Sequence, residues 1–300
     1  MKIIIRNKPE ELSKYVLFIL ILSFFGIISC FQKEEKGMKD SDSKEKTYER
    51  IVVLDPAAVE MIYLLGSEDK IVGIAKLEKS EIWPEDKTGK LESVGTFIRP
   101  SLEKIISLKP DMVIGSFHTT ETMDKSLKSN GIEIMKIRAS SIEEIFENFQ
   151  ELGKILGKEE MVNKIIAEKK VKIEEIKRME TKEKKGVFIL SATPMRVFGK
   201  NTLPNDIMKM LNIKNIAEDL GSESPTLTPE YIIKENPDII LTFVRDPHEI
   251  VKGNPQIKGI NALKNNKFIT LETNHVLRGS PRTIDYIIDV YQKVKEKENK

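Results

Sequence analysis

Short apolar segments alternate with segments of helical periodicity from residue 51 onward, and this alternation limits the chain to few folds. Residues 51–54 form an apolar run, Met61 and Leu65 mark the helical segment that follows, and residues 71–74 form the next apolar run. Parallel strands require a crossover connection, which is usually a helix. Strand, helix and strand in this order therefore predict a parallel sheet.

The same order continues toward the middle of the chain. Apolar runs at residues 112–114 and 132–135 predict two further strands. A helix is expected after Ser141, because a serine followed closely by two glutamates is typical of a helix N-terminus. We predict that these elements form an N-terminal α/β lobe over residues 49–157.

A long helix is expected next, over residues 158–185. This stretch contains no Pro or Gly, and its apolar residues recur among Lys and Glu, which favours one largely exposed helix. A second α/β lobe is expected over residues 186–300, because apolar runs and helical stretches alternate again. The apolar runs lie at residues 187–190, 196–198, 239–241 and 268–271, and the helical stretches at 207–211 and 282–290.

An internal repeat relates the two lobes. Glu103 is followed seven residues later by Pro110, and Glu230 is followed seven residues later by Pro237. In both copies two isoleucines lie shortly after the Glu, and an Asp with an apolar run follows the Pro. The helix dipole favours an acidic residue in the first turn, so each copy predicts a short helix, a turn and a buried strand. The two lobes are therefore expected to be built alike.

The N-terminal segment, residues 1–29, predicts an export signal. Basic residues precede an apolar run over residues 16–28, which is shorter than the roughly 20 residues that span a bilayer. Ser29 and Cys30 resemble the lipobox of bacterial lipoproteins, so we expect Cys30 to be lipidated. Residues 30–48 are otherwise polar and are expected to form a flexible tether. The folded part would then be extracytoplasmic, anchored to a bacterial membrane in the periplasm or at the cell surface.

Composition argues against several classes of function. Without the signal peptide, basic and acidic residues are equal in number and interspersed. This balance argues against a nucleic-acid partner, because phosphate binding needs a basic face. Cys30 is the only cysteine, so the chain can form no internal disulfide and no cysteine-based zinc site. We expect a monomer that carries no cofactor.

The sequence lacks the motifs of common enzyme classes. It contains no P-loop, no G-x-G-x-x-G after a strand, no G-x-S-x-G and no H-E-x-x-H. Nucleotide-dependent and hydrolytic chemistry would lack their usual residues. We therefore expect a binding protein and not an enzyme.

Short segments spread between Arg50 and Val294 carry a resemblance to a known family. They are residues 50–54 with Pro56 and Glu60, and residues 94–95, 100–103, 108–111, 236–238 and 279–282. They resemble the periplasmic-binding-protein-like proteins that serve ABC importers for iron siderophores, haem and cobalamin. The resemblance implies two Rossmann-like α/β lobes with parallel-rich sheets, joined by a single long α-helix. It also implies an ABC permease and its ATPase as partners, with Glu103 and Glu230 pairing with arginines on the two permease subunits.

Loops that follow strands are the candidate ligand site, because open α/β folds bind ligands at the carboxyl ends of their strands. His118, His248 and His275 all follow apolar runs. Imidazole coordinates iron, so we expect His118 and His275, ahead of His248, to contact an iron chelate or a haem with an open coordination position. A direct metal-ion site is a minor alternative, because the histidines are divided between the lobes.

Three arginines also lie in loops after strands or between the lobes: Arg99, Arg245 and Arg278. A guanidinium group grips carboxylate or catecholate oxygens through its planar fork, so these residues indicate an anionic ligand. Phe97 and Trp83 are expected to form apolar walls of the same site. The resemblance implies that Phe97 lies at a position where the cobalamin-binding members of the family tend to have an aromatic residue.

Together these features favour an extracytoplasmic solute-binding component of an ABC importer, which captures an iron(III) chelate, either a siderophore or haem, between its lobes. Cobalamin is the alternative ligand within the same class, favoured by the aromatic residues. A lipoprotein adhesin or an enzyme that uses the same fold is the alternative from a different class, because fold does not fix function.

Overall fold

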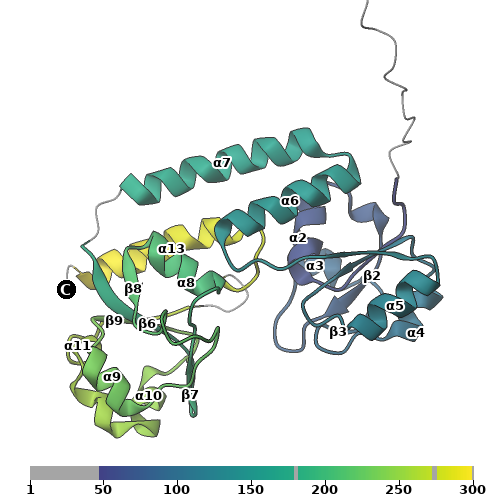
Figure 1. Ribbon diagram of the computed structural model, residues 1–300. Helices are drawn as coiled ribbons and strands as arrows, with labels where there is room; N and C mark the ends of the chain where they lie inside the picture. The colour runs from purple at the N-terminus through teal and green to yellow at the C-terminus, as the bar shows by residue number, and fades with distance from the viewer. Residues whose placement is uncertain (1–46, 179–181, 272–275, 299–300) are drawn as a thin grey trace, which may run out of the picture. The chain divides into compact units, whose positions relative to one another are not determined.

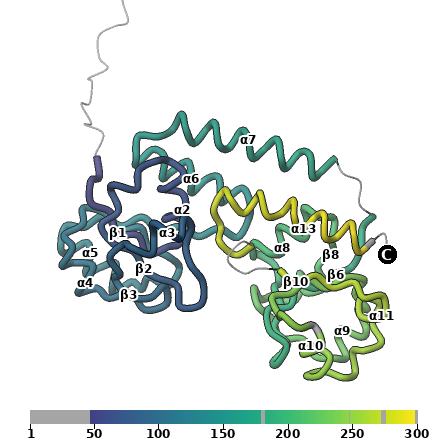
Figure 2. Tube along the Cα trace, turned by 180° about the vertical axis from the view of Figure 1, so that it is seen from behind, coloured from purple at the N-terminus to yellow at the C-terminus, as the bar shows by residue number. Residues whose placement is uncertain are grey.

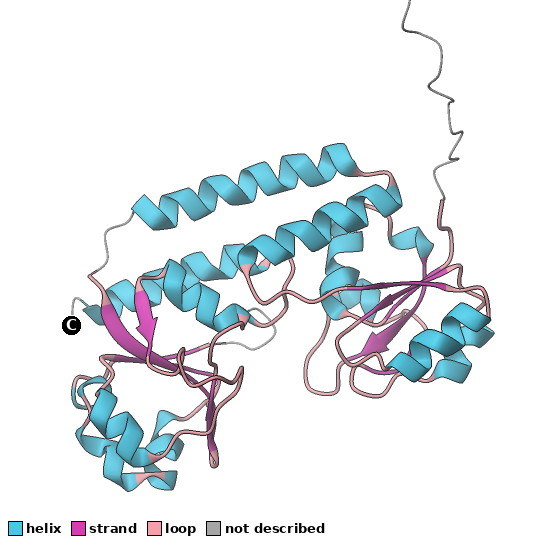
Figure 3. Cartoon of the chain, viewed as in Figure 1, coloured by secondary structure: helices cyan, strands magenta, loops and turns pink. Residues whose placement is uncertain are grey.

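Two α/β lobes make up the described part of the chain (Figure 1; Figure 3). The computed structural model describes residues 47–178, 182–271 and 276–298. The predicted signal peptide and Cys30 lie outside these ranges. Within them, no helix combines the length and the apolar character that crossing a membrane would need.

The first sheet is parallel throughout, with strand order β3-β2-β1-β4-β5. The chain adds strands on one side of β1 and then on the other, so the strand order reverses between β1 and β4. Ligands of open α/β sheets bind at such a switch point, beyond the carboxyl ends of the strands. The strands are β1 (Ile51–Val53), β2 (Ile71–Lys76), β3 (Ser93–Thr96), β4 (Met112–Gly115) and β5 (Glu133–Lys136).

Both faces of the first sheet are covered because successive strand residues point to opposite sides. Ile51 and Val53 belong to one apolar cluster, and Val52 and Leu54 belong to another. Helix α2 packs against the first face, and Ile105 of α4 and Leu127 of α5 complete the cluster on the second. The helices are α2 (Pro56–Leu64), η1 (Glu68–Lys70), α3 (Glu85–Thr88), α4 (Leu102–Ser107) and α5 (Glu121–Ser129).

The second sheet has strand order β10-β9-β6-β7, with β8 also pairing with β6. The β6–β7 pair is antiparallel and the other pairs are parallel, so the sheet is parallel-rich, as the sequence predicts. Its strands are β6 (Lys184–Ala192), β7 (Met195–Val197), β8 (Ile213–Asn215), β9 (Ile239–Thr242) and β10 (Phe268–Thr270). Its helices are α8 (Leu203–Met210), α9 (Pro229–Glu235), α10 (Pro247–Gly253), η2 (Pro255–Gly259), α11 (Asn261–Lys264) and α13 (Thr283–Glu298).

Two helices carry the chain from the first sheet to the second. Helix α6 (Ile142–Leu156) ends at Gly157, whose φ of 62° provides a left-handed cap, and α7 (Glu159–Arg178) follows. The long helix predicted over residues 158–185 is therefore correct in kind but too long. Lys184 and Lys185 lie in β6, because pairing with β8 and β9 overrides their helical propensity.

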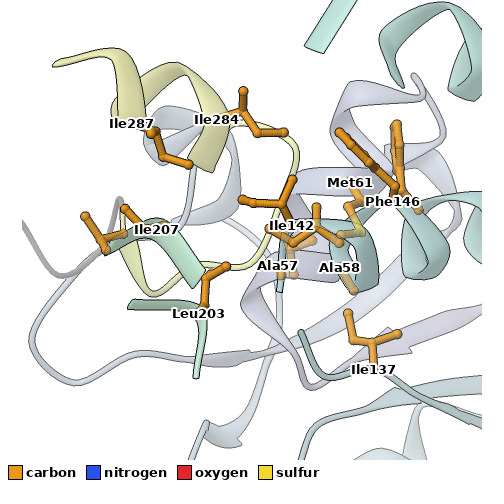
Figure 4. Packing of buried hydrophobic residues seen from close by; sticks show 14 of the residues in the cluster. Ala57, Ala58, Met61, Ile137, Ile142, Phe146, Leu203, Ile207, Ile284 and Ile287 are labelled. Carbon is orange, nitrogen blue, oxygen red and sulfur yellow. The ribbon is translucent and has the colours of Figure 1, made fainter. Parts of the chain in front are cut away.

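One apolar cluster is shared by both lobes. It joins residues of β1 and α2 to residues of β6, α8 and α13, with α6 and α7 between them. Figure 4 shows Ile142 of α6 close to Ala57 of α2, with Leu203 and Ile284 from the second lobe on its other side. Helix α7 contacts both α6 and α13, and it runs alongside them in the reverse view of Figure 2. The shared core favours small relative movements of the lobes, because close-packed interiors deform little.

The internal repeat read from the sequence has the same geometry in both lobes. Ser101 and Thr228 cap the two short helices through their side chains. Lys109 and Asn236 end the two units with φ values of 48° and 47°. The following aspartates both accept hydrogen bonds from the backbone at the start of the neighbouring parallel strand, Asp111 from Glu49 and Arg50 and Asp238 from Lys185.

Candidate functional site

A pocket of about 470 Å³ opens at the carboxyl ends of the first sheet. The loops that follow all five of its strands contribute to the wall, which places the pocket at the predicted topological position. From this lobe the lining residues are Asp55, Pro56 and Ala57 after β1, Leu77 and Ser80 after β2, Phe97 after β3, Phe117 after β4, Ile137, Arg138, Ala139 and Ser140 after β5, and Asn148 of α6.

The second lobe supplies the opposite wall, so the pocket lies between the lobes. Phe198 and the start of α8 contribute after β7, and Glu223 contributes after β8. The segment before α13 closes the remaining side. These residues are Phe198, Asn201, Thr202, Leu203, Pro204, Glu223, Leu277, Arg278 and Gly279.

Aromatic rings stand on both walls of the pocket. The Phe97 and Phe117 rings meet edge to face with centroids 5.6 Å apart, and Phe117 is 60% exposed. Phe198 on the other wall is held by the Phe188 and Phe243 rings, with centroids 5.3 and 6.0 Å away. A flat apolar ligand would find ring faces or edges on either side.

His118 lies beside the aromatic wall and outside the pocket lining. Its ring centroid is 4.8 Å from that of Phe97 and 4.1 Å from that of Phe117. Burial lowers the pKa of the imidazole, so the ring is neutral at pH 7 and a nitrogen lone pair is free for a metal. The predicted contact of His118 with a ligand stays a prediction.

Arg278 lines the pocket and is paired with a buried acid, while its predicted contact with a ligand stays a prediction. Its Nε lies 3.0 Å from Oε1 of Glu60, and the two side chains are 5% and 3% exposed. Burial raises the pKa of the Glu60 carboxyl, and the nearby positive charge of Arg278 opposes this rise. Burial also lowers the pKa of the Arg278 guanidinium, and the nearby Glu60 carboxylate opposes this fall. The pair joins α2 to the segment before α13.

Further groups complete the surroundings of Glu60. Ser280 donates its hydroxyl hydrogen to Oε2 at 2.6 Å, and Nη1 of Arg282 lies 3.5 Å from Oε1. The Arg282 guanidinium also lies 4.2 Å from the centre of the Trp83 ring. A guanidinium over an indole face is a favourable contact, so Trp83 is held against Arg282. Trp83 is not among the residues that line the pocket, where it was expected.

A second arginine of the pocket is also paired with an acid. Nη2 of Arg138 lies 2.6 Å from both carboxylate oxygens of Glu223. Arg138 follows β5 in the first lobe and Glu223 follows β8 in the second, so this ion pair joins the two walls. Both side chains are about half exposed, at 53% and 52%.

Asp55 lines the pocket at the switch point. Its Oδ1 accepts a hydrogen bond of 2.8 Å from the Ala57 amide, which caps α2. Burial raises the pKa of this carboxyl to about 7, against the lowering effect of the backbone amides and of Arg278. Asp55 is therefore partly protonated near neutral pH.

Other predicted ligand contacts lie away from the pocket. Arg99, Arg245 and His248 are exposed and are not among the lining residues. His275 lies outside the described residues. In the described ranges, no group of three or more His, Cys, Asp or Glu side chains is arranged to hold a metal ion.

Glu103 and Glu230 occupy equivalent positions on the two lobes. Each is the second residue of a short capped helix, α4 or α9, and each side chain is exposed. The described part of the chain records no salt bridge for either carboxylate. Both are thus available to a partner.

Sequence reasoning missed the residues that carry most of the pocket's character. Phe117, Phe198, Glu223 and Arg138 all follow strands, so the rule that selected the loop histidines could also have selected them. Glu60 was visible as an acid inside the apolar sequence from Ala57 to Ile62, which is a signal of a buried charge.

Comparison with known proteins places this geometry in a family. Residues 51–274 match the periplasmic binding protein family. An uncharacterised ABC transporter substrate-binding lipoprotein of Bacillus subtilis is 28% identical over 260 residues, covering 83% of this chain and 81% of the relative. A vitamin B12-binding protein of Vibrio parahaemolyticus is 26% identical, covering 83% and 91%. The solved structure of a possible iron-binding, periplasmic solute-binding protein of Staphylococcus epidermidis is 26% identical, with a TM-score of 0.71, covering 83% of this chain and 99% of that one.

Proposed function

Because this chain belongs to the periplasmic binding protein family, we propose that it captures a large, weakly charged macrocycle, a corrinoid such as cobalamin, and delivers it to an ABC importer. The ligand would sit in the pocket between the two lobes. The general role, that of a solute-binding component of an ABC importer, follows from the family and from the relatives of this chain.

One observation carries the choice of ligand: both arginines of the pocket are already paired with acids. Arg278 is held by Glu60, and Arg138 is held by Glu223. Asp55 adds no positive charge, and the described lining contains no lysine. A polyanionic ligand would therefore meet no free cation among the described lining residues, whereas Phe97, Phe117 and Phe198 offer apolar surface to a macrocycle.

The paired arginines favour a corrinoid over an iron(III) chelate, whereas the sequence alone favours the chelate. The sequence favours the chelate because Arg99, Arg245 and Arg278 indicate an anionic ligand and because the loop histidines are suited to iron. Two of these arginines lie outside the pocket lining and the third is neutralised. Support for a corrinoid also comes from the Vibrio parahaemolyticus relative, whose name states vitamin B12 binding.

Haem is the second candidate, and His118 is the observation that favours it. The neutral imidazole lies beside the Phe97 and Phe117 rings, with centroids 4.8 and 4.1 Å away. Both rings line the pocket, so an imidazole this close to them could offer an axial ligand to the iron of a haem bound there.

Thermal unfolding of the full-length protein with cyanocobalamin, haem or ferric citrate tests the proposal. At about 100 times its Kd a ligand stabilises the folded state by about 2.7 kcal/mol, which raises the Tm by about 5–10 °C. Cyanocobalamin is expected to give this shift and ferric citrate none. The reverse result would reject the proposed ligand class.

Phe97→Ala identifies the site in the same experiment. Loss of a buried aromatic contact is expected to weaken cyanocobalamin binding by about tenfold or more. Ile233→Ala is the matched control, because Ile233 is 46% exposed on α9 and outside the pocket lining. Equal effects of the two substitutions would place the ligand elsewhere.

Docking to the permease is proposed to use Glu103 and Glu230. Single exposed ion pairs contribute only about 0–1 kcal/mol, but one pair on each lobe would fix the orientation of the protein on its importer. The matching geometry of the two helices supports this assignment, because each presents its carboxylate from the same position of the same structural unit.

Anchoring through Cys30 is proposed from the sequence and agrees with the word lipoprotein in the name of the Bacillus subtilis relative. Tethering raises the effective concentration of the binding lobes near the permease. Cys30→Ala should therefore impair uptake more than ligand binding. Unchanged uptake by that variant, with normal export, would refute the anchor.

A further inference from the structure

We propose that Glu223 is a specificity-determining residue that keeps carboxylate-bearing ligands out of the pocket by holding Arg138. The inference rests on the proposed function and goes beyond it, because it assigns a role to an ion pair that spans the two walls. Nη2 of Arg138 lies 2.6 Å from each oxygen of Glu223, and both residues line the pocket.

The backbone holds both partners of this pair in place. The Arg138 carbonyl accepts a hydrogen bond of 2.8 Å from the side-chain amide of Asn148 on α6. The Glu223 carbonyl accepts one of 2.9 Å from the Gly199 amide. A Cβ at residue 199 would lie 2.1 Å from the Ser222 carbonyl oxygen, so only glycine permits this close approach. The pair is thus positioned from both lobes.

Stability alone does not account for such an arrangement. Both side chains are about half exposed, at 53% and 52%, and ion pairs in that setting are screened by water and contribute little to folding. Their position at the pocket has a larger consequence for ligands. A ligand carboxylate that sought Arg138 would have to displace Glu223 and would then face its negative charge at close range.

Glu60 repeats the same arrangement outside the pocket lining, in the buried interior. It holds Arg278, which also lines the wall, with both side chains almost fully buried. Glu223 is the accessible member of these two acids, since Glu60 is only 3% exposed. Its removal would therefore free a cation at the pocket surface without leaving a charge stranded in the core.

Two kinds of ligand that differ by one negative charge test the inference. They are cyanocobalamin and its monocarboxylates, in which one peripheral amide is hydrolysed to a carboxylate. Wild-type protein is expected to bind the neutral form about tenfold more tightly than the monocarboxylates, the size of one charge-assisted hydrogen bond. Glu223→Gln should abolish or reverse this preference by strengthening monocarboxylate binding. Adding Arg138→Gln to that variant should remove the gain.

Controls separate the possible failures. Glu235→Gln removes an acid that pairs with Lys185 at 3.2 Å on the same lobe, outside the pocket, and should leave the preference unchanged. High salt should reduce the wild-type preference, because the pair is exposed. An unchanged preference in Glu223→Gln, or an equal change for both ligands, would overturn the inference while leaving the proposed function intact. Wild-type protein that binds none of these corrinoids would overturn both.

Discussion

Replacing Glu60 by Gln should destabilise the fold strongly, although Glu60 lies outside the pocket lining. The Glu60 and Arg278 side chains are 3% and 5% exposed, so Glu60→Gln removes the carboxylate that is paired directly with a buried guanidinium. Breaking a buried ion pair on one side typically costs about 3–5 kcal/mol. For a folded unit of this size, that loss corresponds to a fall in Tm of about 6–20 °C.

Urea unfolding and thermal unfolding of the full-length protein measure this effect. Glu68→Gln is the matched control, because Glu68 pairs with Lys87 at 3.5 Å on the surface and should change stability by less than about 1 kcal/mol. Glu60→Leu combined with Arg278→Met should recover most of the loss, because an apolar pair of similar volume carries no unpaired charge. A Glu60→Gln variant as stable as the control would refute the reasoning.

Two further predictions concern docking and pH. The double substitution Glu103→Arg and Glu230→Arg should abolish uptake in cells while leaving ligand affinity unchanged. The control is Glu121→Arg with Glu249→Arg, which also alters one exposed first-turn acid on each lobe and should leave uptake intact. A loss of ligand affinity in the first double variant would contradict the docking role. The folded state raises the pKa of Asp55 from 3.8 to about 7, so the folded protein binds this proton more tightly than the unfolded chain does, and the contribution of Asp55 to stability declines as the pH rises from about 4 to above 7. Asp55→Asn should remove this decline, so its stability relative to wild type in urea unfolding should be greater at pH 8 than at pH 5, by up to about 4 kcal/mol. An equal stability difference between variant and wild type at both pH values would show that the carboxyl does not take up a proton on folding.

The sequence predicted most of the architecture because local patterns determine it. Apolar runs bounded by polar turns gave the strands, and the repeated unit that begins at Glu103 and Glu230 recurs with matching caps and matching positive φ values. The end of the long helix was wrong for a tertiary reason. Lys184 pairs with Ile213 in β8, and no local signal distinguishes it from a helical lysine.

The position of the pocket could be predicted, but the state of its charges could not. Strand ends are visible in a sequence, and a topological rule brings them together. Which acid meets which arginine depends on contacts between segments far apart in the chain, such as Glu60 with Arg278 and Arg138 with Glu223. An anionic ligand is predicted from the sequence because the arginines are visible there, whereas the acids that pair with them are not recognisable as their partners.

Equilibrium dialysis of the full-length protein against cyanocobalamin tests the central claim, that the pocket takes a weakly charged macrocycle. We predict saturable binding of one corrinoid per chain, which a large excess of ferric citrate does not displace and which Phe97→Ala weakens. Absence of saturable binding, or displacement of the corrinoid by ferric citrate, would contradict the account.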